Sequence, residues 1–414
     1  MSNFRYKDKC VLCESKKLTN VVEFPNTPIA NKLKKKEVDD EELSYPLILS
    51  ICEDCKHIQL KSIVSSEILF NEYPYRSNSN QTTASRLIEL STEIECSLGK
   101  KDPKTLIEIG SNDGFLMGQL QKFGWQVLGI DPAIDASKIA QIQGMKVIVA
   151  FFSLELARQL KQDNGEVSLI IANNVLAHSN DLRSIFKGIY ELLSDDGTLI
   201  MEFSYALDIL NNLLFDTIYH EHTSYHSLIS LIPFLFEFKL EPVKAVRFDA
   251  HGGSIRLYIK KIIANSVIED SISNLIKIES NSGVDKVSAW KNFENQISNL
   301  RISITELLND IGEKNLSIVG YGVPAKFATL FHVLSLDENL FSYLVDDNKE
   351  KQNNFGPGTK LRIFSPEVLK NDPPDYIFIF SWNYSEEIIR KIKSNKLAKV
   401  GIICPLSSFS VIRI

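Results

Sequence analysis

The chain has 414 residues, more than one ordinary hydrophobic core accounts for, so we expect two or three domains. Hydrophobic residues make up 44% and charged residues 24%, which is typical of a folded globular protein and excludes a disordered one. The formal net charge of -6 provides no general field for binding nucleic acid or an anionic membrane.

The start of the sequence and its apolar stretches favour a cytoplasmic protein. Residues 1–7 lack the apolar core of a secretory signal. The most apolar later stretch, residues 228–238, is short and is interrupted by Pro233, so it lacks the length of a membrane span. We therefore expect neither membrane nor nucleic-acid partners.

Two Cys-x-x-Cys pairs lie near the N-terminus, and their four thiolates can form a tetrahedral zinc site. Four sulfur ligands leave no position for an activated water, so we expect the metal to be structural. The 38 residues between the pairs exceed the length of a compact zinc ribbon, which leaves a redox pair or a chance spacing as the alternative. The predicted ligands are Cys10, Cys13, Cys52 and Cys55.

Residues 70–80 form a polar segment in which Tyr73 and Tyr75 flank Pro74. Proline disfavours helix at the preceding residue, and the Ser/Asn cluster that follows suits either a helix cap or a loop. The pattern predicts a connector or lid, followed by a helix over 82–98.

The most informative stretch is residues 106–114, in which an apolar run and an acid lead to Gly110 and Gly114. This pattern is typical of a buried strand whose glycine turn opens a helix and lets a ligand approach the backbone. A dinucleotide site prefers Gly-x-Gly-x-x-Gly, whereas this spacing favours the turn that binds S-adenosylmethionine in class I methyltransferases.

A second strand, 125–130, ends at Asp131, where an acid can accept hydrogen bonds from both ribose hydroxyls. An ordinary turn without a ligand is the alternative. The predicted cofactor-binding residues are Glu108, Gly110, Ser111, Asn112, Gly114, Asp131 and Asn174.

Strands and helices alternate from residue 105 to residue 203, which predicts a doubly wound parallel sheet. Two strand-like segments around residues 251–253 match the antiparallel edge hairpin of methyltransferases. A long polar helix, about 285–311, then leads to a third unit. We expect an α/β protein with a small N-terminal zinc-binding domain, a class I methyltransferase (Rossmann-like) central domain and a C-terminal Rossmann-like α/β domain, over residues 1–68, 69–280 and 281–414.

The third unit opens with residues 316–326, another strand, glycine turn and helix. The spacing Gly320-x-Gly322, with Asp346 about twenty residues later, resembles a dinucleotide fingerprint. However, Lys326 stands where phosphates would meet the helix and can reach a pyrophosphate as a point charge. We therefore favour a nucleotide-sugar diphosphate over NAD at this turn.

Three histidines, two tyrosines and an acid lie together in residues 219–226. In a helix Tyr219 and His222 would share one face at i, i+3, whereas in a strand His220 and His222 would point away from Tyr219 and Glu221. The cluster could be a buried polar network, a metal site around His220 and His222, or a centre for general acid and base catalysis.

Motifs along nearly the whole chain resemble, in order, the nucleotide-sugar C-methyltransferases of deoxysugar biosynthesis. Besides the four cysteines they are Leu106–Gly114, Ala172–His178, Phe215–His222, Gly252-Gly253-Ser254-x-Arg256, Pro324-Ala325-Lys326 and the segment 375–384. The resemblance implies zinc in the N-terminal domain, S-adenosylmethionine in the middle domain, and a dTDP-linked 4-keto-6-deoxysugar between the middle and C-terminal domains.

The resemblance also implies roles for individual residues. It makes His222 the general base, and it places around the sugar Tyr219, Glu221, His178 and one of the pair Tyr73 and Tyr75. The predicted substrate-binding residues are Arg256, Lys326, Asp346, Trp382 and Asn383.

The chemistry agrees with such a cluster on physical grounds. A C–H bond beside a 4-ketone is acidic because the charge spreads onto oxygen, so methylation at carbon needs a base and hydrogen-bond donors to the oxyanion. Each donor, such as Tyr219 or His178, is worth about 3 kcal/mol. We expect an S-adenosylmethionine-dependent C-methyltransferase that acts at C3 of a nucleotide-diphosphate 4-keto-6-deoxysugar.

Other functions stay open at this point. Methylation at C5, which also adjoins the ketone, is the alternative within the class, and an O- or N-methyltransferase fits the dense cluster less well. An NAD-dependent nucleotide-sugar oxidoreductase would use the Gly320 turn, and a non-catalytic binding module would bind neither cofactor. The sequence does not fix the stereochemistry of the sugar or the oligomeric state, for which a monomer is one option.

Overall fold

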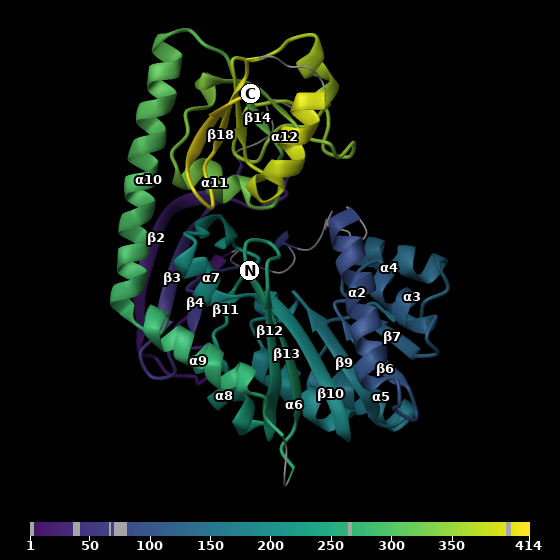
Figure 1. Ribbon diagram of the computed structural model, residues 1–414. Helices are drawn as coiled ribbons and strands as arrows, with labels where there is room; N and C mark the ends of the chain where they lie inside the picture. Colours follow the sequence, from purple (N-terminus) through teal and green to yellow (C-terminus); the bar gives the residue numbers. More distant parts are fainter. Residues whose placement is uncertain (1–3, 36–41, 66–67, 70–80, 264–266, 395–398) are drawn as a thin grey trace.

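A computed structural model describes residues 4–35, 42–65, 68–69, 81–263, 267–394 and 399–414 of the chain. Figure 1 shows a lower body that contains the largest sheet, an upper body formed by the C-terminal residues, and the long helix α10 (Val287–Glu313) running along one side of both. The strands of the N-terminal region lie between this helix and the centre of the molecule.

The N-terminal region is built on two small sheets. A two-stranded sheet pairs β1 (Phe4–Tyr6) with β5 (Ser62–Val64). A four-stranded sheet has the order β11-β4-β3-β2, with bounds β2 Leu18–Pro28, β3 Ser44–Cys52, β4 Ile58–Leu60 and β11 Ser224–Tyr225. Because β11 comes from the middle of the chain, the N-terminal sheet is completed by a strand about 160 residues further on.

The middle region contains a seven-stranded sheet of order β12-β13-β10-β9-β6-β7-β8. Its strands are β6 Thr105–Ile109, β7 Gln126–Ile130, β8 Val147–Ile148, β9 Val167–Asn173, β10 Leu193–Ser204, β12 Leu240–Phe248 and β13 Ser254–Lys261. Strands β6 to β10 pair in parallel, and the hairpin β12–β13 joins the β10 edge in antiparallel fashion. The predicted doubly wound sheet with an antiparallel edge hairpin is confirmed.

Helices cover this sheet and connect its strands. They are α2 Gln81–Leu98, α3 Phe115–Gln121, α4 Ile134–Ile142, α5 Leu154–Asn164 and α6 Leu182–Leu192. The central strand β9 is buried on both faces, as expected for a parallel sheet covered by helices. Strands β7 and β9 flank β6 on opposite sides, so a crevice opens at the carboxyl ends of these strands.

The chain between β10 and the third unit is mostly helical. It contains α7 Ala206–Asn211, the short 3-10 turn η2 Phe215–Thr217, α8 Leu228–Glu237, α9 Asp270–Ser282 and α10. The predicted long helix near 285–311 corresponds to α10, which is amphipathic and buries Trp290, Phe293 and Ile304. The Glu294 side chain of α10 accepts a hydrogen bond from the backbone N–H of Glu23 in β2 at 2.8 Å, which ties the helix to the N-terminal sheet.

The C-terminal unit is a six-stranded sheet of order β16-β15-β14-β17-β18-β19, parallel except for β19. The strands are β14 Ile318–Tyr321, β15 Phe341–Val345, β16 Ile363–Phe364, β17 Tyr376–Ile379, β18 Gly401–Cys404 and β19 Ser410–Arg413. The helices and 3-10 turns are α11 Phe327–Val333, η3 Glu338–Leu340, η4 Pro366–Lys370, η5 Trp382–Tyr384 and α12 Ser385–Ser394. This arrangement is the predicted Rossmann-like unit.

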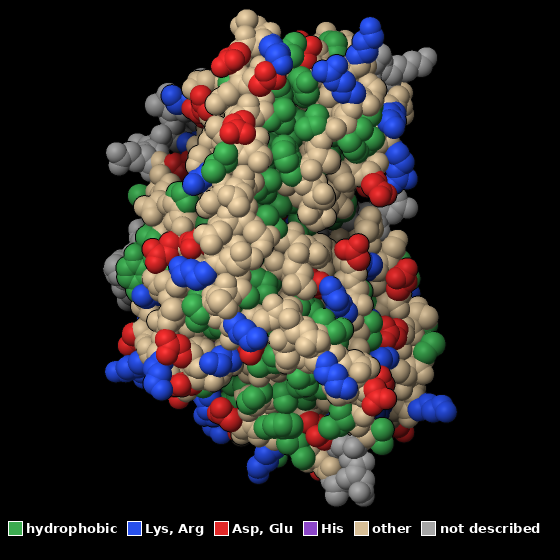
Figure 2. Space-filling view, turned by 60° about the vertical axis from the view of Figure 1, so that its left-hand side comes forward, with side chains coloured by type: hydrophobic (Ala, Val, Ile, Leu, Met, Phe, Trp, Pro, Cys, Tyr) green, Lys and Arg blue, Asp and Glu red, His purple; other side chains and the backbone are tan. Residues whose placement is uncertain are grey.

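One hydrophobic core joins the N-terminal sheet, α10 and the C-terminal unit, with Val21, Leu47, Phe293 and Phe327 among its buried members. On the face shown in Figure 2, basic and acidic side chains are interspersed and form no patch of one sign. No helix in the described part of the chain combines the length and apolarity needed to cross a bilayer.

Candidate active site

A cavity of about 1360 Å³ opens at the carboxyl ends of the central strands and extends to the C-terminal unit. Its lining comes from every part of the fold: Asn31 from the N-terminal region, Asp131 and His178 from the middle, and Lys326 and Asn383 from the C-terminal unit. The volume exceeds the roughly 300–1000 Å³ of a site for one small ligand, so the cavity has room for two.

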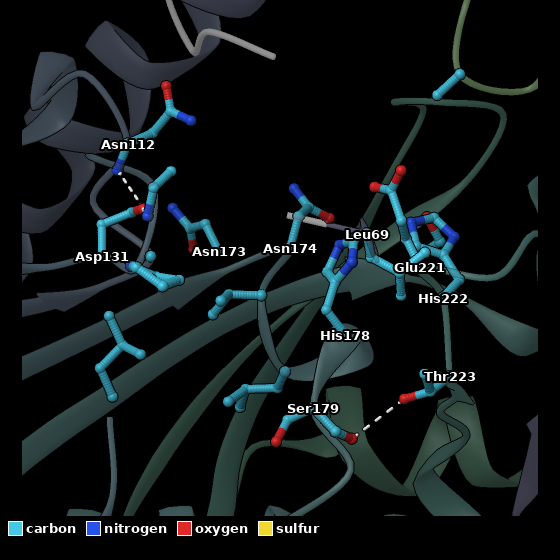
Figure 3. Close-up of a pocket in the computed structure, with 18 of the residues that line it drawn as sticks. Leu69, Asn112, Asp131, Asn173, Asn174, His178, Ser179, Glu221, His222 and Thr223 are labelled. Atoms are coloured by element: carbon cyan, nitrogen blue, oxygen red, sulfur yellow. Dashed lines mark hydrogen bonds between the residues drawn. The ribbon is translucent and has the colours of Figure 1, made fainter. Parts of the chain in front are cut away.

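The turn after β6 is organised by the acid at the end of β7. Asp131 Oδ2 accepts a 2.8 Å hydrogen bond from the backbone N–H of Asn112, and Asp131 Oδ1 accepts one of 2.7 Å from Ala133. Gly110 has φ +73°, and a Cβ there would lie 2.8 Å from Val175 Cγ2, so only glycine fits. Figure 3 shows Asn112 and Asp131 together at one end of the cavity.

Two side chains beside this turn have buried polar atoms without a partner among the described residues. They are Glu108, through Oε2, and Asn173, through both its oxygen and its nitrogen. Burial, followed by the nearby Asp113 and Asp131, raises the pKa of Glu108 well above its usual value. Glu108 and Asn173 thus have polar atoms available for a ligand beside the turn that Asp131 organises. Such groups fit the adenosine and amino-acid parts of S-adenosylmethionine.

The other predicted cofactor residues divide in two. Ser111 and Asn174 line the cavity, and Asn174 adopts the left-handed conformation at φ 52°. Gly114 does not line it; a Cβ at this position would meet Ala140 and Met145, so this glycine lets α3 approach α4 and plays no part in the cavity wall.

At the other end of the cavity, Tyr219 and His222 form a pair. The Tyr219 hydroxyl and His222 Nε2 are 2.8 Å apart, and the backbone of residues 219–222 forms a turn closed by a 2.9 Å hydrogen bond from the His222 N–H to the Tyr219 carbonyl. The turn is neither helix nor strand, yet it brings together the i, i+3 pair that the helical alternative predicted. His222 Nδ1 lies 2.9 Å from the Thr217 carbonyl, which can only accept a hydrogen bond, so Nδ1 carries the proton. Nε2 is therefore unprotonated and is the basic nitrogen of the ring.

His178 and Glu221 complete this end of the cavity (Figure 3). The rings of His178 and His222 meet edge to face with centroids 4.9 Å apart. Burial lowers the pKa of His178 to about 4. Burial also lowers the pKa of His222 well below its usual value, and the neighbouring His178 adds to this effect. Burial raises the pKa of Glu221 to about 8, against an opposing hydrogen bond from Asn31. Both imidazoles are therefore neutral at pH 7, the state that a base requires.

The remaining histidines of the cluster point elsewhere. His220 Nε2 is 3.3 Å from the carbonyls of Tyr45 and Pro46, and His226 stacks on His57 with centroids 5.3 Å apart. Among the described residues, only the four cysteines form a group that could hold a metal ion. The metal interpretation of His220 and His222 is therefore wrong, because their rings face different surroundings.

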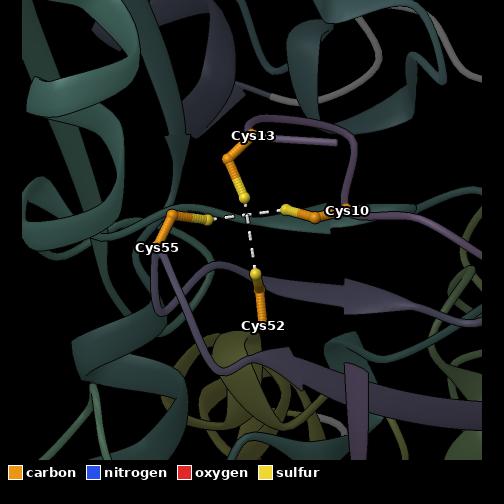
Figure 4. A group of neighbouring side chains, drawn as sticks. All are labelled: Cys10, Cys13, Cys52 and Cys55. Carbon is orange, nitrogen blue, oxygen red and sulfur yellow. Dashed lines mark hydrogen bonds between the residues drawn. The ribbon is translucent and has the colours of Figure 1, made fainter. Parts of the chain in front are cut away.

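The sulfur atoms of Cys10, Cys13, Cys52 and Cys55 all lie within 4.8 Å of one another and converge on one point (Figure 4). The closest pairs, Cys10 with Cys55 and Cys13 with Cys52, are 3.5 Å apart, and all four thiols are free. Zn–S bonds of ~2.3 Å in a tetrahedron place sulfurs roughly 3.8 Å apart, so the group fits zinc and not a disulfide. None of the four lines the large cavity, which makes the zinc structural.

The predicted substrate residues of the C-terminal unit are arranged differently from one another. Lys326 and Asn383 line the cavity, whereas Trp382 lies behind the wall and donates from Nε1 to Asp216 Oδ2 at 2.5 Å. Asp346 does not line the cavity, and its carboxylate accepts hydrogen bonds from the backbone N–H groups of Val323 at 2.7 Å and Asn348 at 2.8 Å. It organises its own turn, as Asp131 does in the middle domain.

Arg256 also lies outside the cavity lining. Its guanidinium donates to Glu202 and to Glu93, both at 2.5 Å, inside a network that joins α2 to the sheet. Tyr73 and Tyr75 lie outside the described residues. The cavity further contains cations and an amide that the sequence analysis did not select: Arg5, Arg86, Lys351 and Asn31. All four lie outside the motifs, so no local signal marked them.

Three family descriptions match the chain in succession: "Putative zinc binding domain" over residues 10–70, "Methyltransferase domain" over 75–243 and "C-methyltransferase C-terminal domain" over 249–406. C-methyltransferase NovU from Streptomyces niveus is 29% identical over 383 residues, which cover 92% of this chain and 91% of that protein. The chain is an S-adenosylmethionine-dependent C-methyltransferase. Its cofactors are S-adenosylmethionine and a structural zinc ion held by the N-terminal domain.

Two solved structures resemble part of this methyltransferase. PH0226 protein from Pyrococcus horikoshii is 15% identical with a TM-score of 0.38, covering 48% of this chain and 100% of that one. Magnesium protoporphyrin IX methyltransferase from Synechocystis, solved with bound S-adenosylmethionine, is 14% identical with a TM-score of 0.34, covering 43% of this chain and 79% of that one.

Proposed function

We propose that this C-methyltransferase transfers a methyl group to C3 of a nucleotide-diphosphate-linked 4-keto-6-deoxysugar, with His222 as the general base. The observation that supports it is the tautomer of His222: Nδ1 is committed to the Thr217 carbonyl, so the basic Nε2 lies beside the Tyr219 hydroxyl at the cavity wall. A heteroatom acceptor needs only to lose an O–H or N–H proton, whereas a carbon acid needs both a base and donors to the enolate oxygen, which the pairing of His222 with Tyr219 supports.

S-adenosylmethionine supplies, when bound, a methyl group on a positively charged sulfur. Asp131, Glu108 and Asn173 would hold it at one end of the cavity. At the other end, His222 Nε2 would take the proton from the carbon beside the ketone, and the pair of electrons would pass to the ketone oxygen. Donors around that oxygen, Tyr219 among them, would stabilise the charge until the carbon attacks the methyl group.

The shape and charge of the cavity support a nucleotide-diphosphate as the rest of the substrate. The cavity is large enough for two ligands and continues to the C-terminal turn, where Lys351 donates to the Val323 carbonyl at 2.8 Å. Arg5 and Arg86 line the same cavity. The lining holds four cations beside five acids. Burial raises the pKa values of two of the acids, Glu108 and Glu221, so that they are neutral at pH 7 and the lining favours an anionic substrate.

Incubation with S-adenosylmethionine and a panel of 4-keto nucleotide sugars tests the proposal. We expect one of them to gain a single methyl group by mass spectrometry, and NMR to place it on C3. A methyl group on C5 would support the alternative within the class. A methyl group on oxygen or nitrogen, or no transfer to any member of the panel, would contradict the proposed carbon-acid chemistry.

A further inference from the structure

Lys326, which the sequence predicts to reach a pyrophosphate, has an ammonium group held by groups in the wall of the cavity. Its Nζ donates a 3.0 Å hydrogen bond to the His251 carbonyl, lies 4.0 Å from Asp216 Oδ1 and sits 4.9 Å from the centroid of the Trp382 ring. The side chain is only 12% exposed. The ammonium group is therefore mostly buried and forms part of the wall of the cavity.

The position of this ammonium group is next to the proposed base. Asp216 and Thr217 are consecutive residues of η2, and the carbonyl of Thr217 holds His222 Nδ1. Lys326 thus lies beside the short segment that orients the His222 imidazole, and Lys326 and His222 line the same cavity. Its positive charge also contributes to the lowered pKa values of His222 and His251, after the larger effect of burial.

A different lysine is better placed for the diphosphate. Lys351 donates from Nζ to the Val323 carbonyl at 2.8 Å, directly on the glycine turn of the C-terminal unit, and lies 3.7 Å from Asp346. Its side chain is 21% exposed and also lines the cavity. The two lysines therefore lie in different parts of the cavity. Lys351 is at the glycine turn of the C-terminal unit, and Lys326 is beside Tyr219 and His222.

We propose that Lys326 is a further catalytic residue, whose ammonium group stabilises the enolate oxygen of the substrate, while Lys351 binds the diphosphate. This proposal rests on the proposed function, since it requires a ketone. When His222 removes the ring proton, the C–H electrons form the C–C double bond and the carbonyl electrons move to oxygen. Lys326 donates a hydrogen bond to that oxygen and keeps its proton; the carbonyl re-forms as the carbon takes the methyl group.

The geometry suits this role better than that of a plain ion pair. Asp216 Oδ1 is buried and accepts no hydrogen bond among the described residues, and at 4.0 Å from Nζ it is too far to take one from Lys326. Asp216 therefore holds the ammonium group of Lys326 in place by charge and does not occupy any of its N–H donors. Of the three N–H donors of an ammonium group, one is taken by the His251 carbonyl, and no second hydrogen bond from Lys326 Nζ is made to the residues that the structure describes, so two donors can serve a ligand.

Exchange of the ring proton with deuterated water, measured without S-adenosylmethionine, isolates the step that Lys326 assists. At saturating substrate we expect Lys326→Met to slow exchange by about 100-fold, as for the loss of one oxyanion donor, and Lys326→Arg to restore part of the rate. The dissociation constant for dTDP alone should change less than about threefold. In Lys351→Met the pattern should reverse, with dTDP binding weakened at least about tenfold and the exchange rate at saturation kept.

Exposed Lys349, two residues from Lys351, offers a neutral control as Lys349→Met. Should Lys326→Met weaken dTDP binding and exchange normally at saturation, Lys326 would be the diphosphate ligand and the proposal would be overturned. Unchanged exchange together with a lower melting temperature would reduce Lys326 to a structural ion pair. The acid limb of the exchange rate gives a further readout, because loss of the cation should move it to higher pH. Wild-type protein that exchanges no proton in any 4-keto sugar would instead refute the proposed function.

Discussion

Tyr219 and His222 face each other across 2.8 Å, hydroxyl to Nε2, while the opposite ring nitrogen is held by the Thr217 carbonyl. Because the carbonyl fixes the tautomer, the Tyr219 hydroxyl is the donor in this pair. In the proposed mechanism, the substrate's C–H would approach the nitrogen that the tyrosine occupies in the resting enzyme. Tyr219 would then be released to donate to the ketone oxygen as the base takes the proton.

His222→Asn tests this arrangement, because the amide of asparagine can still donate to Thr217 but offers no basic nitrogen. We expect kcat to fall by about 10²- to 10⁴-fold and proton exchange to be lost, and Tyr219→Phe to cost about 10²-fold. Steady-state kinetics and exchange in deuterated water measure both effects. His220→Asn is the control from the same turn, since that ring faces Tyr45 and Pro46. Exchange that survives in His222→Asn would assign the base to another residue.

Stability should depend on pH through Glu221. Burial raises the pKa of Glu221 to about 8 in the folded chain, whereas an unfolded glutamate has a pKa of about 4.3. Between these values the folded state holds a proton that the unfolded state has lost, so this residue makes stability fall as the pH rises from about 4.3 to about 8.

Glu221→Gln cannot ionise, so we expect the variant to be more stable than the wild type above pH ~8 and similar to it near pH 4.5. Calorimetric melting temperatures across this range provide the measurement, with exposed Glu89→Gln on α2 as a control that leaves the slope unchanged. A wild-type slope that persists in Glu221→Gln would show that this carboxyl does not carry it.

The zinc site should support both stability and the cavity. Cys55→Ser should remove the metal and lower the melting temperature, because zinc binding to a closed four-sulfur site contributes folding free energy directly. Activity should fall as well, since Asn31 and Ile63 of the same domain line the cavity. Metal analysis and calorimetry test this, and exposed Cys96→Ser should retain the zinc. Full zinc occupancy in Cys55→Ser would contradict the four-cysteine site.

Asp131 should control cofactor affinity through the turn that it organises. In Asp131→Asn one oxygen becomes an N–H₂ group that cannot accept from the backbone, so one of the two hydrogen bonds from Asn112 and Ala133 is lost. A bond of this kind to a charged group is worth about 1.5–3 kcal/mol, which predicts an S-adenosylmethionine dissociation constant raised about 10- to 100-fold. Titration calorimetry measures it, and exposed Asp135→Asn should behave as the wild type.

Arg256 should matter for stability and not for substrate affinity. Arg256→Met leaves Glu202, which is almost fully buried, without this partner and should cost about 3–5 kcal/mol in free energy of unfolding. KM should stay close to that of the wild type, because Arg256 does not line the cavity. Denaturant unfolding and steady-state kinetics separate the two effects. A raised KM with unchanged stability would return Arg256 to the substrate-binding residues.

The features that could be read from sequence are those written in short, contiguous patterns. The turn at Gly110, the acid at Asp131 and the two cysteine pairs each need only local spacing, and the alternation of strands and helices predicts a doubly wound parallel sheet. The motif residue Asp346 shows the limit of this approach. The spacing is that of a ligand-binding acid, and Asp346 holds Val323 and Asn348 as Asp131 holds its own turn. However, Asp346 does not line the cavity, which only coordinates reveal.

The parts that could not be predicted depend on packing between distant segments. Asn31 reaches Glu221 across the domain boundary, and Arg256 meets Glu93 from 163 residues away. Neither pairing leaves a mark in the local sequence, because each partner is an ordinary polar residue in its own segment. The family resemblance located the motifs but could not separate residues that face the cavity from those behind its wall.

The strand β11 has a consequence for attempts to dissect this enzyme. It follows the Tyr219–His222 turn directly, and its Ser224 and Tyr225 pair in antiparallel register with Gln59 and Ile58 of β4. Cutting the gene after the cysteine-rich segment would therefore strip the backbone support from beneath the proposed base. Domains exchanged between such enzymes should keep β4 and β11 together, because the Tyr219–His222 turn otherwise loses the strand pairing that supports it.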